Sequence, residues 1–122
     1  MASSCTIKFF NEDNDEPFTC VSHYIDGKPN MVGLDLAIWL KDIEIIDGIG
    51  RERIEDGYAN GMGCLAAQYI AKVKNEVGNV YIRDVDHVER HNYEVHIKYG
   101  RIRIKYNDFY GKPDQYIEKL KQ

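Results

Sequence analysis

The chain has 122 residues, of which 43% are hydrophobic and 30% are charged. This composition is ordinary for one globular domain and argues against disorder and against two full domains, so we expect a single domain over residues 1–122. Twenty acidic and sixteen basic residues give a formal net charge of -4. That charge disfavours duplex nucleic acid as a partner, because duplex binding depends on neutralising phosphates, and any nucleotide site should be a local basic patch.

The cysteines and the N-terminal segment indicate the compartment. Cys5, Cys20 and Cys64 are odd in number, lie far apart and contain no CxxC pair, so they predict neither a disulfide framework nor a zinc site. The first residues lack a basic stretch followed by a long apolar one, and no run of eighteen apolar residues occurs. We therefore expect a cytoplasmic protein with no metal, no cofactor and no membrane partner.

The N-terminal third predicts a hairpin and then a helix. Residues 5–10 and 18–25 are rich in β-branched and aromatic side chains, and the polar run 11–17 between them predicts a mobile acidic loop. Over residues 31–46 apolar side chains recur every three or four positions, as in a helix packed on a core. Leu34 and Ile38 add a second apolar face, which indicates either burial against a second subunit or packing beneath the acidic loop.

The middle of the chain predicts a long loop and then a helix with clear start and stop signals. Residues 47–59 hold three glycines among charged residues without periodicity, and long loops often carry function. Asn60 is a natural N-cap for a helix that we expect to run to the stop at Gly78.

The last third predicts strands and a final helix. Residues 80–85, 93–99 and 101–106 indicate an antiparallel meander, and residues 113–122 a short helix with Pro113 in its first turn. The expected fold class is α+β, with an antiparallel sheet of about five strands packed with two or three helices.

Positive charge gathers on the last predicted hairpin. Strand alternation places His96 and Lys98 on one face together with Arg101, Arg103 and Lys105, and leaves only Glu94 as an anion in that set. Arginine pairs bidentately with phosphate oxygens, so two on one face could clamp a pyrophosphate. The alternative is a solvated face whose cations prevent pairing at the sheet edge.

Two further features have residue types that can take part in binding or catalysis. The glycines around Met62 could expose backbone N–H groups to an anion at a helix N-terminus, although a helix start packed closely against another backbone is the favoured interpretation. His87, His91 and His96 fall on a turn and on strands, where they would not converge as metal ligands do.

The segments from His23 to Pro29, from Asn60 to Gln68 and from Gly78 to Ile82 together resemble the Thoeris anti-defence 1 proteins of phages and prophages. The resemblance implies a small homo-oligomer in the cytoplasm of a bacterial host. It implies binding of the cyclic ADP-ribose isomer (glycocyclic ADP-ribose) made by TIR-domain proteins, and in some members of cyclic oligonucleotide signals, without degradation. In that family the ligand sits in a recess between subunits.

The ligand-binding residues are assigned from their chemistry. Arg101 and Arg103 would hold phosphates, a loop arginine would close over them, and a tyrosine would stack on the base. Amide side chains would contact the base or ribose. The full predicted set is Arg51, Arg53, Tyr58, Asn60, Met62, Gln68, Asn92, His96, Arg101 and Arg103.

Two other functions stay open at the level of sequence. The chain could be a hydrolase or lyase acting on the same nucleotides, with His96 or His91 as general base. It could also be a phage inhibitor that caps a host protein through the acidic loop from Glu12 to Glu16.

Overall fold

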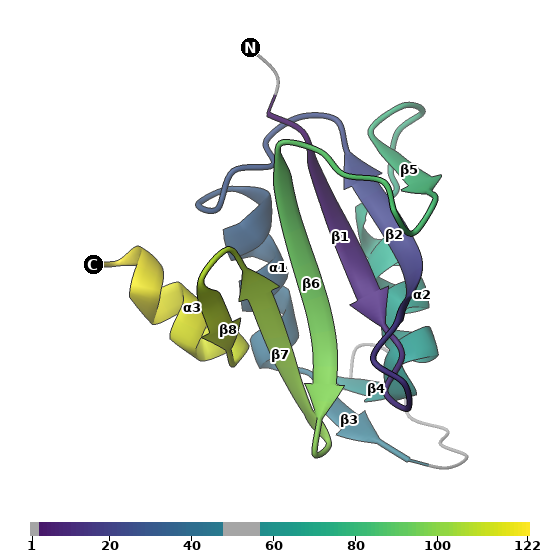
Figure 1. Cartoon of the computed structure of the whole chain (residues 1–122), viewed down its shortest axis with the longest axis vertical. Coiled ribbons are helices and arrows are strands. Elements are labelled where there is room, and N and C mark those ends of the chain that lie inside the picture. Colours follow the sequence, from purple (N-terminus) through teal and green to yellow (C-terminus); the bar gives the residue numbers. More distant parts are fainter. Residues whose placement is uncertain (1–2, 48–56) are drawn as a thin grey trace.

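The structure is a computed structural model that describes residues 3–47 and 57–122. It is an α+β fold in which a six-stranded sheet is packed with helices, as predicted (Figure 1). The sheet has the order β5-β2-β1-β6-β7-β8. Its strands are β1 (Cys5–Phe10), β2 (Pro17–His23), β5 (Val80–Arg83), β6 (His91–Lys98), β7 (Arg101–Tyr106) and β8 (Phe109–Gly111).

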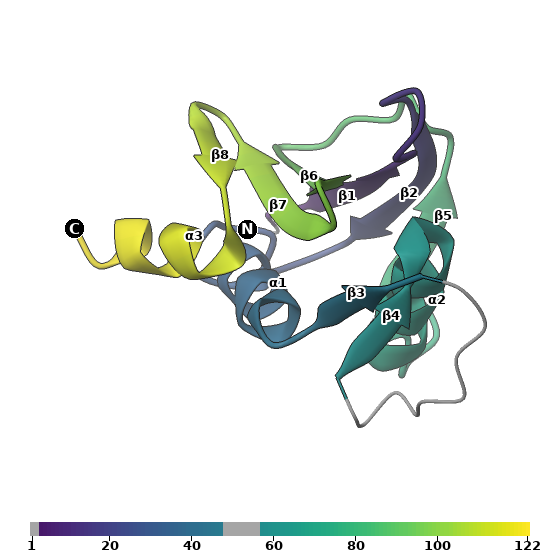
Figure 2. The same ribbon diagram turned by 90° about the horizontal axis from the view of Figure 1, so that it is seen from below.

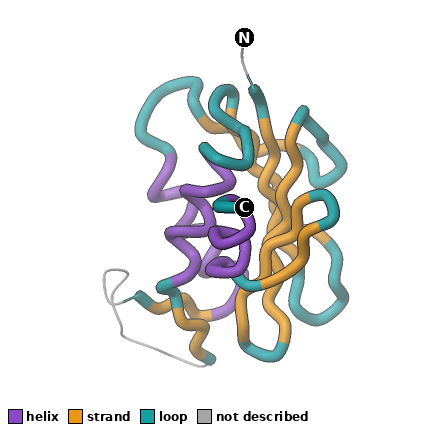
Figure 3. The backbone as a smooth tube through the Cα atoms, turned by 90° about the vertical axis from the view of Figure 1, so that its left-hand side faces the viewer, coloured by secondary structure: helices purple, strands orange, loops and turns teal. Residues whose placement is uncertain are grey.

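The helices of the described part lie together on one face of this sheet (Figures 2 and 3). They are α1 (Val32–Lys41), α2 (Gly61–Val73) and α3 (Pro113–Leu120). Strand alternation turns Ile7, Phe9 and Val95 toward these helices, where they are fully buried. The core therefore fills the space between the helices and one face of the sheet, and the other face carries most of the polar side chains.

The predicted meander is partly wrong. β6, β7 and β8 do form consecutive antiparallel pairs, but β5 lies at the opposite edge and pairs with β2. The segment 84–90 then passes over β1 and β2, so that β6 lies parallel to β1 in the middle of the sheet (Figure 1). Parallel neighbours need such a crossover, and local strand patterns do not show where a connection crosses.

Several predicted boundaries also differ. The first helix ends at Lys41 and the β-branched residues after it form β3 (Glu44–Ile46), because such side chains favour strands. β3 pairs in parallel with β4 (Tyr58–Asn60), which overlaps the end of the predicted loop 47–59 and the predicted cap residue Asn60. The second helix ends at Val73, where the side chain of Asn79 donates a hydrogen bond to the Val73 carbonyl at 3.0 Å.

The second apolar face predicted for the first helix is only partly covered by the rest of the described chain. Leu34 is half-buried and Ile38 is 45% exposed. Trp39 packs against Tyr69 of α2, with ring centroids 5.5 Å apart.

Within the described residues, no helix has the length and apolarity needed to span a bilayer.

Two tyrosines, one from the sheet and one from α3, hold the segment that leads into α1. Tyr93 of β6 is fully buried, and its hydroxyl donates to the carbonyl of Gly27 at 2.7 Å. Tyr116 of α3 donates to the carbonyl of Pro29 at 2.8 Å. Both side chains lie against Gly33, where an added Cβ atom would clash with the Tyr116 hydroxyl and come within 2.9 Å of the Tyr93 ring. This site accepts only glycine without rearrangement.

We predict that Gly33→Ala destabilises the fold by about 1–3 kcal/mol, the usual cost of overpacking a closed site. The control is Gly63→Ala in α2, where an added Cβ meets nothing within 4 Å. Because alanine has the higher helix propensity, Gly63→Ala should leave stability unchanged or raise it by up to about 1 kcal/mol. Urea unfolding of both variants measures the difference, and equal midpoints would contradict the packing described for Gly33.

Candidate functional site

Two neighbouring cavities lie at the end of the sheet where β6 turns into β7. Their volumes are about 630 and about 480 Å³, and Ile45 of β3 and Gly100 of the β6–β7 turn line both of them. Both volumes fall in the range of small-molecule sites. The two cavities differ in charge, and this difference decides which ligand each can accept.

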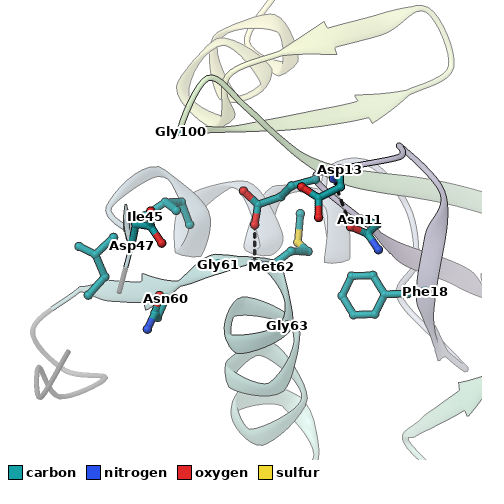
Figure 4. Close-up of a pocket in the computed structure, with 12 residues that line it drawn as sticks. Asn11, Asp13, Phe18, Ile45, Asp47, Asn60, Gly61, Met62, Gly63 and Gly100 are labelled. Atoms are coloured by element: carbon teal, nitrogen blue, oxygen red, sulfur yellow. Dashed lines mark hydrogen bonds between the residues drawn. The ribbon is translucent and has the colours of Figure 1, made fainter. Parts of the chain in front are cut away.

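The first cavity is acidic (Figure 4). Phe18 and Met62 supply apolar surface, while the carboxylates of Glu12, Asp13 and Asp47 are the charged groups among its described lining residues. Phosphate oxygens would be repelled by three carboxylates in one recess. The remaining lining residues are Asn11, Ile45, Ile46, Asn60, Gly61, Gly63 and Gly100.

The start of α2 is capped from the acidic loop. The backbone N–H of Met62 donates to Oε2 of Glu12 at 3.2 Å, drawn as a dashed line in Figure 4. A carboxylate is stabilised there by the unpaired N–H groups and the helix dipole. The predicted residues Asn60 and Met62 do line this cavity, but an anionic ligand at the helix start would have to displace Glu12.

The second cavity lies where β7 continues beyond β8. Lys98 and Arg101 flank the two-residue turn Tyr99-Gly100, in which both residues have positive φ angles of 54° and 74°. The two residues that flank such a turn form a hydrogen-bonded pair, and hydrogen-bonded and non-hydrogen-bonded pairs then alternate along the hairpin. The backbone groups of Arg101 and Arg103 therefore bond to β6, and those of Ile102 point toward the other edge of β7. β8 pairs only with residues 104–106 of β7. The backbone edge at Ile102 therefore opens into the second cavity.

The two predicted phosphate ligands meet at this edge. Arg101 is exposed and Arg103 is half-buried, and both line the second cavity. Nη1 of Arg103 donates to the carbonyl of Ile102 at 3.3 Å, which brings its guanidinium to the edge of the strand. The charged side chains that line the second cavity are Lys41, Asp42, Glu44, Arg101, Arg103, Lys112 and Asp114.

Part of this charge is already neutralised. Lys41 pairs with Asp42 at 3.0 Å, and both side chains are exposed. Of the other five charged residues, Arg101, Arg103 and Lys112 are cationic, and Glu44 and Asp114 are acidic. The second cavity is thus the less acidic of the two and the one that brings two arginines together.

His96 belongs to a separate cluster on the outer face of the sheet. It is 6% exposed, stacks on Phe10 with ring centroids 4.3 Å apart, and is absent from the lining of both cavities. Its Nε2 lies 2.8 Å from Glu94 and its Nδ1 lies 3.2 Å from Asp15. The acidic loop thus reaches the cationic hairpin.

Asp15 is the counter-anion that the sequence analysis missed. It also pairs with Nζ of Lys98 at 3.0 Å. The hydrogen bond from Lys98 lowers the pKa of the Asp15 carboxyl below its ordinary value of 3.8, and the same contact raises the pKa of Lys98. No local pattern pairs residues 83 positions apart, so only the fold reveals this contact.

The other predicted residues are dispersed. Asn92 accepts hydrogen bonds from Thr6 and from the Glu89 backbone, far along β6 from the hairpin turn. Gln68 is buried in α2 and donates to the carbonyl of Tyr58 at 3.1 Å. Tyr58 of β4 lies opposite Glu44 of β3 in the strand register, and Glu44 lines the second cavity. Arg51 and Arg53 lie outside the described residues.

Two cations of the second cavity were not predicted. Lys41 ends α1, and Lys112 precedes Pro113 at the start of α3. Lys112 stands next to a helix start that the sequence does indicate, whereas the sequence predicts a first helix that continues past Lys41 to residue 46. Their convergence on β7 depends on how the helices pack.

Comparisons with protein-family models, with curated proteins and with solved structures found no match for this chain. The resemblance to the Thoeris anti-defence 1 family therefore stays a prediction, and the site rests on its own geometry.

We predict that the Asp15 contacts stabilise the fold only while its carboxyl is ionised. Because the pKa is lowered in the folded state, this contribution is present above about pH 4 and is lost as the pH falls through the folded-state value. Asp15→Asn should lower the urea midpoint near neutral pH, by a small and salt-sensitive amount because the pair is exposed.

The difference between the wild type and Asp15→Asn should narrow as the pH falls below about 4, and it should close once the pH lies below the lowered pKa of Asp15. Asp13→Asn removes a carboxylate from the same loop and leaves the contacts of Asp15 with Lys98 and His96 in place, so it is the matched control and should keep a urea midpoint close to that of the wild type. A difference for Asp15→Asn that stays constant over this range would contradict the assignment.

Proposed function

We propose that this protein is a non-catalytic binder of a small anionic nucleotide, and that it sequesters a cyclic ADP-ribose-type signal without degrading it. The ligand expected from the resemblance is glycocyclic ADP-ribose, and cyclic oligonucleotide signals are a second candidate class. The proposal places the protein in the cytoplasm of a bacterial host as a homodimer or higher homo-oligomer. Duplex nucleic acid and membranes are not among its proposed partners.

The observation that carries this proposal is the meeting of Arg101 and Arg103 at one recess. A guanidinium offers a rigid fork of donors to phosphate oxygens, and two at neighbouring positions suit a diphosphate. Lys112 adds a third cation, and the open backbone N–H of Ile102 adds a neutral donor. A cavity of about 480 Å³ has room for a ligand of nucleotide size.

Sequestration demands high affinity. A nanomolar dissociation constant corresponds to about -12 kcal/mol. Hydrogen bonds to charged groups contribute roughly 1.5–3 kcal/mol each, and base stacking roughly 1–3 kcal/mol. Two arginines, a lysine and one stacked base would supply contributions of this size. Tyr58 lies opposite Glu44 in the β3–β4 register, beside the cavity, and remains the residue proposed to stack on the base.

The geometry gives less support to catalysis by a histidine. Both ring nitrogens of His96 lie beside carboxylates of the same chain. Nδ1 of His91 lies 2.8 Å from the Tyr106 hydroxyl, and burial lowers the pKa of this imidazole. Neither histidine lines the cavity that holds the arginines.

A protein-capping role for the acidic loop competes with contacts inside the chain. Glu12 caps α2, and Asp15 pairs with Lys98 and His96. A host protein that bound these carboxylates would first have to release them.

Calorimetry with glycocyclic ADP-ribose tests the proposal. Arg101→Ala and Arg103→Ala should each weaken binding about 10- to 100-fold, the equivalent of one lost charge-assisted hydrogen bond. Lys105→Ala is the matched control, since this cation lies on the same strand but does not line the cavity. Absence of heat at micromolar protein, or equal affinity in all variants, would contradict the proposal.

Recovery of the ligand separates binding from turnover. Heating the complex should release intact ligand, as expected of a binder. Conversion products that accumulate with time would instead favour the hydrolase or lyase.

A further inference from the structure

The turn between β6 and β7 holds a residue that its backbone conformation disfavours. Tyr99 and Gly100 form this turn, and Tyr99 has a φ angle of 54°. Bulky side chains are rare at positive φ, because the Cβ atom comes too close to the following carbonyl oxygen. The other non-glycine residues with positive φ in the described part are Asp15, Asp26 and Asn107, which are of the types that tolerate this conformation.

The next turn of the chain has the more usual kind of residue at the same place. Two residues also join β7 to β8, and Asn107 is the first of them, with a φ angle of 51°. Asparagine followed by glycine is a preferred sequence for a two-residue turn in which both φ angles are positive. Gly100 meets this preference in the β6–β7 turn, so the tyrosine before it is the departure.

The side chain of Tyr99 does not compensate for this strain within the fold. Tyr99 is fully exposed. None of the hydrogen bonds and ring contacts found among the described residues involves its side chain. Backbone strain of this kind is concentrated at active sites and ligand-binding sites, where the strained residue has a role in function. We therefore looked for a ligand that the ring could contact.

Tyr99 lies next to the second cavity. Gly100, the residue after it, lines both cavities, and Arg101 lines the second. The first cavity is acidic and repels phosphate, so the second is the one that suits a nucleotide. An exposed side chain changes rotamer within nanoseconds, and the Tyr99 ring is therefore free to turn onto a ligand bound there.

We propose that Tyr99 stacks on the base of the nucleotide whose phosphates Arg101 and Arg103 hold, an inference that rests on the proposed function. In a nucleotide the ribose joins the base to the phosphates, so a stacking ring has to lie close to the phosphate ligands. Tyr99 precedes Arg101 by two residues. A base has two faces, and contact of one face with Tyr99 leaves the other open to Tyr58. The site would thus prefer a nucleotide to a phosphate compound without a base.

Tyr99→Asn separates binding from stability. Asparagine suits positive φ, so this variant should have a urea midpoint equal to or above that of the wild type. It should bind glycocyclic ADP-ribose about 10- to 100-fold more weakly in calorimetry, which corresponds to the loss of one stacked base. Tyr99→Phe keeps the ring and should bind like the wild type. Tyr24→Asn is the matched control, because Tyr24 is an exposed tyrosine that lines neither cavity.

Inorganic pyrophosphate, which has no base, provides the second comparison. Tyr99→Asn should bind pyrophosphate as the wild type does, whereas Arg101→Ala should weaken the binding of both ligands. Unchanged affinity of Tyr99→Asn for the nucleotide, or an equal loss for pyrophosphate, would overturn the stacking role and leave the proposed function standing. A wild-type protein that does not bind glycocyclic ADP-ribose would contradict the proposed function, and the stacking role with it.

Discussion

The candidate site depends on where the chain leaves the sheet. β8 ends at Gly111, and Pro113 begins α3 two residues later. Proline has no N–H to donate to a strand and its fixed φ suits the first turn of a helix, so the chain turns away before it can pair with Ile102. The open edge of β7 at Ile102 follows from that turn, whereas strand alternation places Arg101 and Arg103 on one face beside it, and both line the second cavity.

Two carboxylates of the acidic loop neutralise positive charge elsewhere in the molecule. Glu12 occupies the N-terminus of α2, and Asp15 neutralises Lys98 beside His96. One loop thus fills two of the places where the sequence offered positive charge to a ligand. The arginines of β7 are left beyond its reach, which explains how a chain with a net charge of -4 can keep one recess suited to an anion.

The sequence predicts the features that arise from nearby residues. Alternation over residues 93–106 correctly sorts the β6–β7 hairpin, with His96 beside Arg103 and Lys98 beside Arg101. It fails where distant segments meet. The parallel pairing of β1 with β6, the three-residue strands β3 and β8, and the contacts of Asp15 depend on tertiary packing, which leaves no periodic signal.

Amide NMR during titration with glycocyclic ADP-ribose tests the central claim most directly, because it locates the ligand residue by residue. The account predicts that the amide signals of Arg101, Ile102, Arg103 and Lys112 shift together, and that those of Gly61, Met62 and Gly63 at the capped helix start do not. Shifts confined to the helix start, with Ile102 unmoved, would contradict it.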